Sequence, residues 1–171
     1  MVFEFSVSYM ITYILTTVLA FSGVYVGALL ALMAKEELKP GRAYLKAFEN
    51  TLLVFIFLIL LYSYDANIIV IILLGIVASV FLYLTTNKTP VNQIAYFLLG
   101  IALYFSTKST DLFIMTATMI FLYGLPIGSI YVSRRLKKSK KTIFTDLILH
   151  FGLFVIVALM TNLIGMYMVK W

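Results

Sequence analysis

Polar side chains inside three long apolar stretches are the residues of this chain that could bind a solute. Each stretch carries one close pair of them: Thr16 and Thr17, Thr116 and Thr118, and Thr161 and Asn162. Burying a hydroxyl or an amide among apolar groups is unfavourable unless it forms a hydrogen bond, so such groups often mark binding sites. We expect Thr17, Thr118 and Asn162 to converge on one ligand.

A purely structural alternative exists for the threonines. A threonine hydroxyl can bond the carbonyl four residues earlier in its own helix, which needs no ligand. That alternative does not extend to Asn162, because its amide has more donors and acceptors than one backbone carbonyl can satisfy. The site hypothesis therefore depends most on Asn162.

Glu49, Asp146 and His150 form a second candidate, a proton relay. Asp146 and His150 are four residues apart and would share one face of a helix, and an imidazole titrates near neutral pH. Glu49 holds the matching place at the start of the second apolar stretch. The alternative is again structural, since acidic side chains in the first turn of a helix complement its dipole and pair with nearby lysines.

Residues for catalysis are scarce. The chain has one histidine and no cysteine, so neither a histidine-rich metal site nor a Cys–His pair can form. The Gly-x-Ser-x-Gly motif of serine hydrolases is also absent. We therefore predict no enzyme, no metal and no cofactor.

The elements that carry these residues are predicted to lie in a membrane. With 63% hydrophobic and 12% charged residues and a mean hydropathy of +1.07, the chain has too little polar surface to coat a soluble globule. A helix needs about 20 apolar residues to cross a bilayer. We predict a single all-α domain over residues 1–171, a bundle of six transmembrane helices at 7–34, 46–64, 67–85, 92–106, 111–133 and 143–169. The fourth is short enough to be a re-entrant or interfacial segment instead.

The basic residues predict the orientation of this bundle. Of the 13 Lys and Arg residues, all except Lys108 and Lys170 fall in loops on one side of the six stretches. The positive-inside rule makes that side cytoplasmic and leaves both termini outside the cell membrane. Six of the eight residues of Arg134–Lys141 are basic, so we expect this loop to bind anionic lipid headgroups rather than nucleic acid.

Small residues recur at intervals of four on two of the predicted helices: Gly23, Gly27 and Ala31 on the first, and Gly124 and Gly128 on the fifth. In lipid, such residues let helix backbones approach each other, which predicts packing within the bundle. A docking face for a partner membrane subunit, or for a second copy of the chain, is the alternative. Pro126 removes a helical hydrogen bond between the two glycines of the fifth helix and predicts a kink or hinge.

The segment Ala34–Tyr44, with its Glu-Glu-Leu-Lys-Pro-Gly sequence at Glu36–Gly41, resembles a loop of small uncharacterised multispan membrane proteins of archaea. The resemblance implies a six-helix archaeal membrane protein and brings no activity with it.

These patterns favour a small integral membrane protein of the transport or channel type, whose solute the residues do not identify. For Thr17, Thr118 and Asn162 to meet, the first, fifth and sixth helices must be mutual neighbours, with the short fourth helix peripheral or capping the bundle. The alternative is a non-catalytic subunit or scaffold of a larger membrane complex, which would dock through the face of Gly23, Gly27 and Ala31.

Overall fold

The computed structural model describes residues 7–34, 36, 38–85, 91–136 and 139–169, and these residues form helices without a β-strand. The helices are α1 (Val7–Met33), α2 (Leu38–Ser63), α3 (Ile68–Thr85), α4 (Val91–Phe105), a short 3₁₀ turn η1 (Ser106–Lys108), α5 (Thr110–Ser133), α6 (Lys140–Phe151) and α7 (Leu153–Val169). The predicted all-α class is confirmed.

Among the described residues, four helices are long and apolar enough to cross a membrane. They are Val7–Met33, Pro40–Ser63, Thr110–Ser133 and the combined segment Lys140–Tyr167. Ile68–Leu82 and Ile94–Lys108 are apolar but shorter. The outer surface is apolar as well, since α3 exposes most of its isoleucine, leucine and valine side chains. Such a surface is stable against lipid and not against water.

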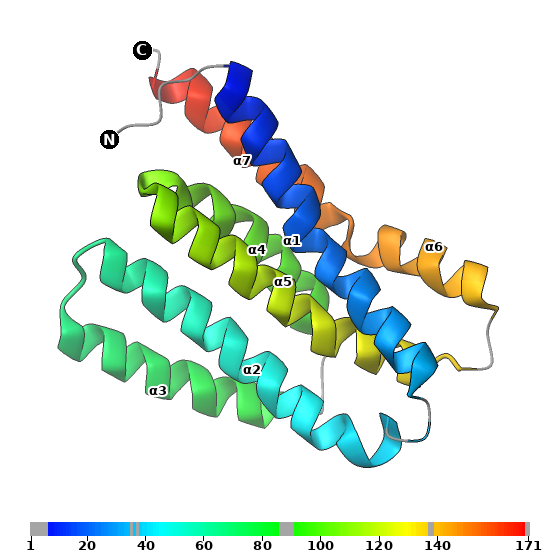
Figure 1. Cartoon of the computed structure of the whole chain (residues 1–171). Helices are drawn as coiled ribbons and strands as arrows, with labels where there is room; N and C mark the ends of the chain where they lie inside the picture. Colours follow the sequence, from blue (N-terminus) through cyan, green and yellow to red (C-terminus); the bar gives the residue numbers. More distant parts are fainter. Residues whose placement is uncertain (1–6, 35, 37, 86–90, 137–138, 170–171) are drawn as a thin grey trace.

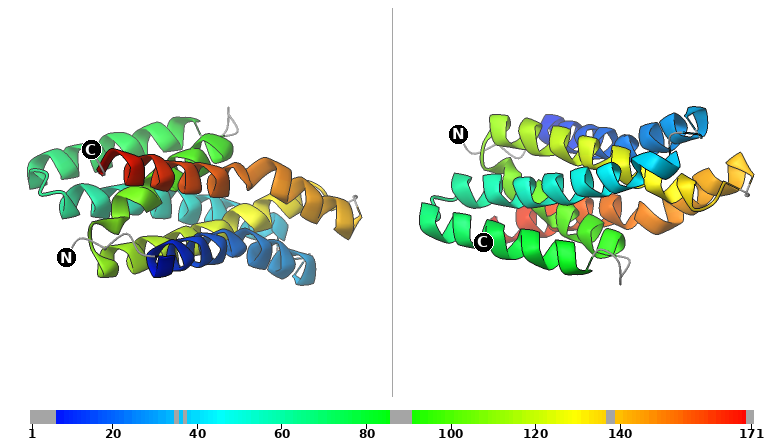
Figure 2. Two further views of the ribbon diagram at one scale, coloured as in Figure 1. Left: turned by 90° about the horizontal axis from the view of Figure 1, so that it is seen from above. Right: turned by 90° about the horizontal axis from the view of Figure 1, so that it is seen from below.

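Successive long helices run in opposite directions and form one bundle (Figure 1). The first turn of α1, the last turn of α7 and the α2–α3 turn lie at one end, which we call the terminal end (Figure 1). The start of α6 lies at the opposite end, which we call the basic end. Views from above and below show α3 at one edge of the bundle, where it packs against α2 (Figure 2).

Two helix boundaries differ from the prediction. α2 begins at Leu38 rather than at residue 46, because Pro40 is tolerated in the first turn of a helix, where its missing N–H would have no partner. The predicted last helix is divided at Gly152, where Val155 N–H donates to the Gly152 carbonyl in a tightened turn. α6 bends away from α7 at this point (Figure 1).

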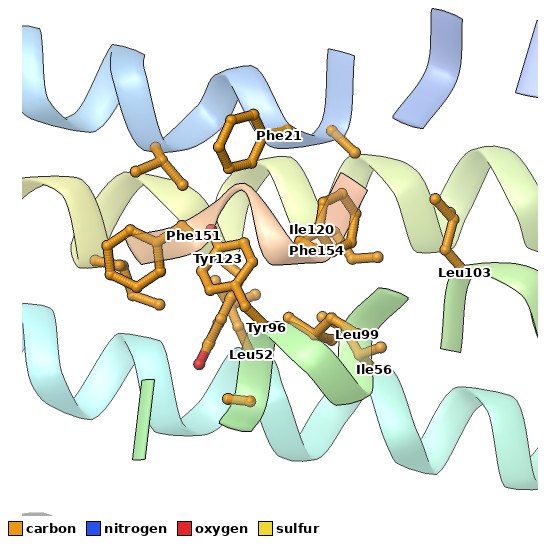
Figure 3. Close-up of a cluster of buried hydrophobic side chains, with 14 of the residues drawn as sticks. Phe21, Leu52, Ile56, Tyr96, Leu99, Leu103, Ile120, Tyr123, Phe151 and Phe154 are labelled. Atoms are coloured by element: carbon orange, nitrogen blue, oxygen red, sulfur yellow. The ribbon is translucent and has the colours of Figure 1, made fainter. Parts of the chain in front are cut away.

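The short helix α4 lies in the core, so its predicted peripheral position is wrong. Tyr96, Leu99 and Leu103 recur on one face of α4 and are at most 1% exposed. They contribute to a cluster formed with α1, α2, α5, α6 and α7 (Figure 3). The 3.6-residue period places these side chains on one face regardless of the length of the helix.

The most extensive contact in the bundle joins α1 and α5. A Cβ atom on Gly23 or Gly27 would overlap the backbone of Phe121 or Leu125, and one on Gly124 or Gly128 would overlap the backbone of α1. Ala31, on the same face of α1, is also buried. The five small residues thus allow two backbones to touch, and the face of Gly23, Gly27 and Ala31 is covered by this chain itself.

Candidate functional site

Asn162 is the polar side chain of α7 that the bundle buries most completely. The spacing of Phe154, Ala158 and Asn162 places all three on the inward face of α7, and Asn162 is 1% exposed. Its Nδ2 donates to the Tyr9 hydroxyl at 2.8 Å. Its Oδ1 has no hydrogen-bond partner among the residues that the structure describes. The amide therefore presents an unused acceptor inside the protein.

Two tyrosines of α1 line the same region. Tyr13 is 1% exposed and its hydroxyl donates to the Ala158 carbonyl of α7 at 3.0 Å. Its ring stacks on Phe113 of α5 with centroids 5.6 Å apart. Tyr9, one turn earlier, lies 6.1 Å from the Tyr13 ring. These bonds join α1 to α7 near the terminal end of the bundle.

α4 and η1 complete the arrangement. The Thr107 hydroxyl lies within hydrogen-bonding reach of Tyr9, and Tyr104 lies within electrostatic range of it. Gly165 of α7 leaves room for the Tyr104 hydroxyl, which a Cβ atom at residue 165 would overlap. Tyr9, Tyr13, Tyr104, Thr107 and Asn162 form what we call the Asn162 cluster. Every side chain in it is uncharged and hydrogen-bonding, which suits an uncharged polar solute.

Of the three residues that were expected to converge, Thr17 and Asn162 are buried, whereas Thr118 is exposed. Thr17 is buried one turn from Tyr13 and its hydroxyl donates to the Tyr13 carbonyl at 2.8 Å. Thr118 is exposed on the surface of α5 and donates to the Ile114 carbonyl at 2.8 Å. Thr116, two residues earlier, is the buried member of that pair. Residues two apart point about 200° apart around a helix, so Thr118 lies on the opposite face of α5 from the buried Thr116.

The helix neighbours explain the same correction. α7 packs mainly against α4 and less extensively against α1, whereas α5 packs against α1 and α2. The first predicted helix therefore contacts both the fifth and the sixth, and the fifth meets the sixth through α6, where Tyr131 packs against His150 and Phe151. Beside α7, however, α4 takes the place that was expected for the fifth predicted helix. Thr161 is half-buried and bonds the carbonyls of Val157 and Ala158 in its own helix.

The residues of the expected proton relay have different environments. Glu49 is buried and its Oε1 accepts from Lys46 at 2.8 Å. Asp146 pairs with Arg135 at 3.1 Å. The His150 ring packs edge-on against Tyr131, with centroids 5.6 Å apart. Among the described residues, no group of three or more His, Cys, Asp or Glu could hold a metal ion.

Pro126 lies inside α5, which is helical on both sides of it from Thr110 to Ser133. The segment expected to act as a hinge is buried, and Gly124 and Gly128 on either side of it contact α1. In the basic loop, Arg135 lies over the Tyr131 ring at 4.1 Å, while Arg134, Lys140 and Lys141 are exposed. Residues 137 and 138 lie outside the described part of the chain.

The tyrosines of the cluster were missed at the level of sequence, although a signal was present. Tyr9, Tyr13 and Thr17 recur every four residues and so form a polar stripe on one face of α1. This stripe predicts that α1 contacts Asn162 through a tyrosine rather than through a threonine.

Comparisons with protein families, with curated proteins and with solved structures found no match for this chain.

Proposed function

We propose that this chain is a small integral membrane protein of the transport or channel type, and that the Asn162 cluster binds its solute. The supporting observation is the Asn162 amide, which is 1% exposed and has an acceptor without a partner in the described structure. Leaving such a group unsatisfied costs about 1–3 kcal/mol. A solute that donates a hydrogen bond would offset this cost.

The chemistry of the cluster favours an uncharged solute. Hydroxyl and amide groups can each donate and accept hydrogen bonds, so they match the hydration of a small polyol or amide. The cluster lies where α1, α4 and α7 meet near the terminal end of the bundle.

The proposal includes six membrane spans with both termini outside. Four helices have the length for this, and α3 and α4 are apolar segments that run antiparallel to the helices before and after them in the chain (Figure 1). The positive-inside rule supports the orientation, because the basic loops lie at the end of the bundle opposite to the termini.

The alternative of a docking subunit is less well supported. The face of Gly23, Gly27 and Ala31, through which it was expected to dock, is buried against α5. A partner would have to bind another surface.

Osmotic swelling of proteoliposomes tests the proposal. Light scattering would follow the entry of glycerol or urea after mixing, with the wild-type protein, Asn162→Leu and Thr118→Val at equal protein content. We expect the wild type and Thr118→Val to admit one of these solutes faster than protein-free liposomes, and Asn162→Leu to lose that increase. Thr118 is the matched control because it faces outward on a spanning helix.

The fold should survive the Asn162→Leu change, since interhelical hydrogen bonds in membranes average only about 0.6 kcal/mol. Circular dichroism and gel filtration check this. Equal swelling rates in wild type and Asn162→Leu, or no swelling above that of empty liposomes for either solute, would contradict the proposal.

A further inference from the structure

Glu49 is a carboxyl group buried within a helix long and apolar enough to span the membrane, and the proposed solute site does not use it. It lies in the fourth turn of α2 and is 2% exposed. Lys46, one turn earlier, donates to Oε1 at 2.8 Å. The second oxygen, Oε2, is buried and has no hydrogen-bond partner within the described ranges. Burying an ionisable group inside a membrane costs free energy, and such groups typically have a function.

Three tyrosine hydroxyls of the bundle are unpartnered in the same way. The hydroxyls of Tyr96, Tyr123 and Tyr131 are buried and make no hydrogen bond to any residue that the structure describes. Tyr96 and Tyr123 are at most 1% exposed, and their ring centroids are 5.5 Å apart. Both belong to the same buried cluster as Leu52 of α2, which follows Glu49 by one turn (Figure 3). The Glu49 carboxylate is within electrostatic range of both phenols.

Charged and titratable groups connect this region to the basic end. Arg134, at the end of α5, acts electrostatically on Glu49. Tyr131, one helical turn before Arg135, contacts three side chains from the basic end: the guanidinium of Arg135 over its ring, and the rings of His150 and Phe151. Asp146 on α6 pairs with Arg135. We call Glu49, Tyr96 and Tyr123 the Glu49 cluster, which Tyr131 adjoins through Phe151.

The bend between α6 and α7 lies beside this cluster. Phe151, the last residue of α6, packs against Tyr96 with ring centroids 5.1 Å apart and against Tyr131 at 5.8 Å. Gly152 follows at the bend. Interrupted helices frequently border the coupling-ion sites of membrane transporters, because the interruption allows one helix half to move.

The phenols suit a carboxyl group that changes its protonation state. A carboxylate only accepts hydrogen bonds, whereas a protonated carboxyl also donates one. A tyrosine hydroxyl can rotate to serve either state, donating to the carboxylate or accepting from the acid. Burial disfavours the charged form of the carboxyl, and the ion pair with Lys46 favours it. A side-chain movement that brings a phenol oxygen to Oε2 would therefore give either state a hydrogen bond.

We propose that Glu49 is an intramembrane proton-binding site served by the tyrosines of the Glu49 cluster. A proton enters from water at the basic end, an O–H bond forms at Oε2, and the new hydroxyl donates to a phenol oxygen of Tyr96 or Tyr123. The reverse step returns the proton to water. A role for this proton in driving solute movement rests on the proposed function.

Infrared difference spectroscopy tests proton binding directly. Spectra of the reconstituted full chain at acidic and at alkaline pH would be compared in the carbonyl region of protonated carboxylic acids. We expect a band of a buried acid in the wild type that is absent from Glu49→Gln. Glu36→Gln, which removes an exposed carboxylate from the turn before α2, should keep the band. Identical difference spectra for wild type and Glu49→Gln would overturn the proposal.

Tyr96→Phe and Tyr123→Phe provide a second readout that keeps the carboxyl and the ring volume in place. Loss of a phenol that bonds the acid should shift the band to higher frequency and move its titration midpoint. An unshifted band in the double variant would overturn the tyrosine role, even if Glu49→Gln failed to fold. No solute is present in these spectra, so failure here leaves the swelling result intact, and failure of the swelling assay leaves the proton site intact.

Discussion

At the scale of single residues, the polar groups of this chain fall into two kinds. Hydroxyls such as those of Thr17, Thr118 and Thr161 bond carbonyls of their own helices and need nothing else. Asn162 instead bonds a different helix and keeps an acceptor unused. A helix can satisfy one hydroxyl locally but not a whole amide, so Asn162 has to be satisfied across the bundle.

Tyr9→Phe tests whether Asn162 depends on a hydrogen bond to another helix. The change removes the acceptor of the Asn162 Nδ2 and leaves both ends of the amide unsatisfied. We expect a loss of unfolding free energy of about 1–2 kcal/mol, measured by denaturant titration in detergent micelles. Tyr64→Phe is the matched control, since Tyr64 is 47% exposed and its hydroxyl bonds the Phe105 carbonyl at the surface. An equal loss in both variants would contradict the account of Asn162.

The sequence identified Asn162 as the residue that a helix cannot satisfy alone, but not its partner. Depth in the membrane follows from counting residues along a helix, and this count placed Thr118 at the level of Asn162. The face of a helix turns by about 100° per residue, and the side facing the bundle depends on which helices are neighbours. The apolar residues on every side of α5 hide that choice, so Thr118 was preferred to Thr116.

At the scale of elements, the α1–α5 contact organises the bundle. Four glycines bring two backbones together where any Cβ atom would overlap, and Ser129 of α5 donates to the Gly27 carbonyl at 2.9 Å. The presence of the helices could be predicted from the apolar stretches, because each stretch is long and free of charge. The start of α2 and the bend at Gly152 could not be predicted in this way. Proline and glycine each permit several backbone conformations, and tertiary packing selects among them.

Gly128→Ala tests the α1–α5 contact. The added methyl group would overlap the backbone of Val24 and Ala28, so the two helices would have to separate. We expect a loss of about 1–3 kcal/mol of unfolding free energy. Gly41→Ala is the control, because nothing lies within 4 Å of a Cβ atom there and alanine favours the helix. Comparable destabilisation by the two changes would contradict a special role for this contact.

At the scale of the whole molecule, the two polar clusters lie toward opposite ends of one apolar bundle. The Asn162 cluster is uncharged and lies near the terminal end, whereas the Glu49 cluster contains a carboxyl and lies toward the basic end. Apolar residues that include Leu99, Ile120 and Phe154 fill the core (Figure 3). This division fits a protein that binds a neutral solute on one side and a proton on the other.

Thiol labelling from one side of the membrane tests this account most directly. The chain has no cysteine, so each introduced cysteine is a unique reporter. An impermeant thiol reagent would be added to intact cells carrying Asn67→Cys at the terminal end, Ser139→Cys at the basic end, or Asn162→Cys. Asn67→Cys should react at once, and Asn162→Cys should react more slowly because residue 162 is buried. Glycerol or urea, whichever the protein admits, should slow labelling at residue 162 further. Ser139→Cys should react only after permeabilisation. Labelling of Ser139→Cys in intact cells, or no labelling of Asn162→Cys from either side, would contradict the account.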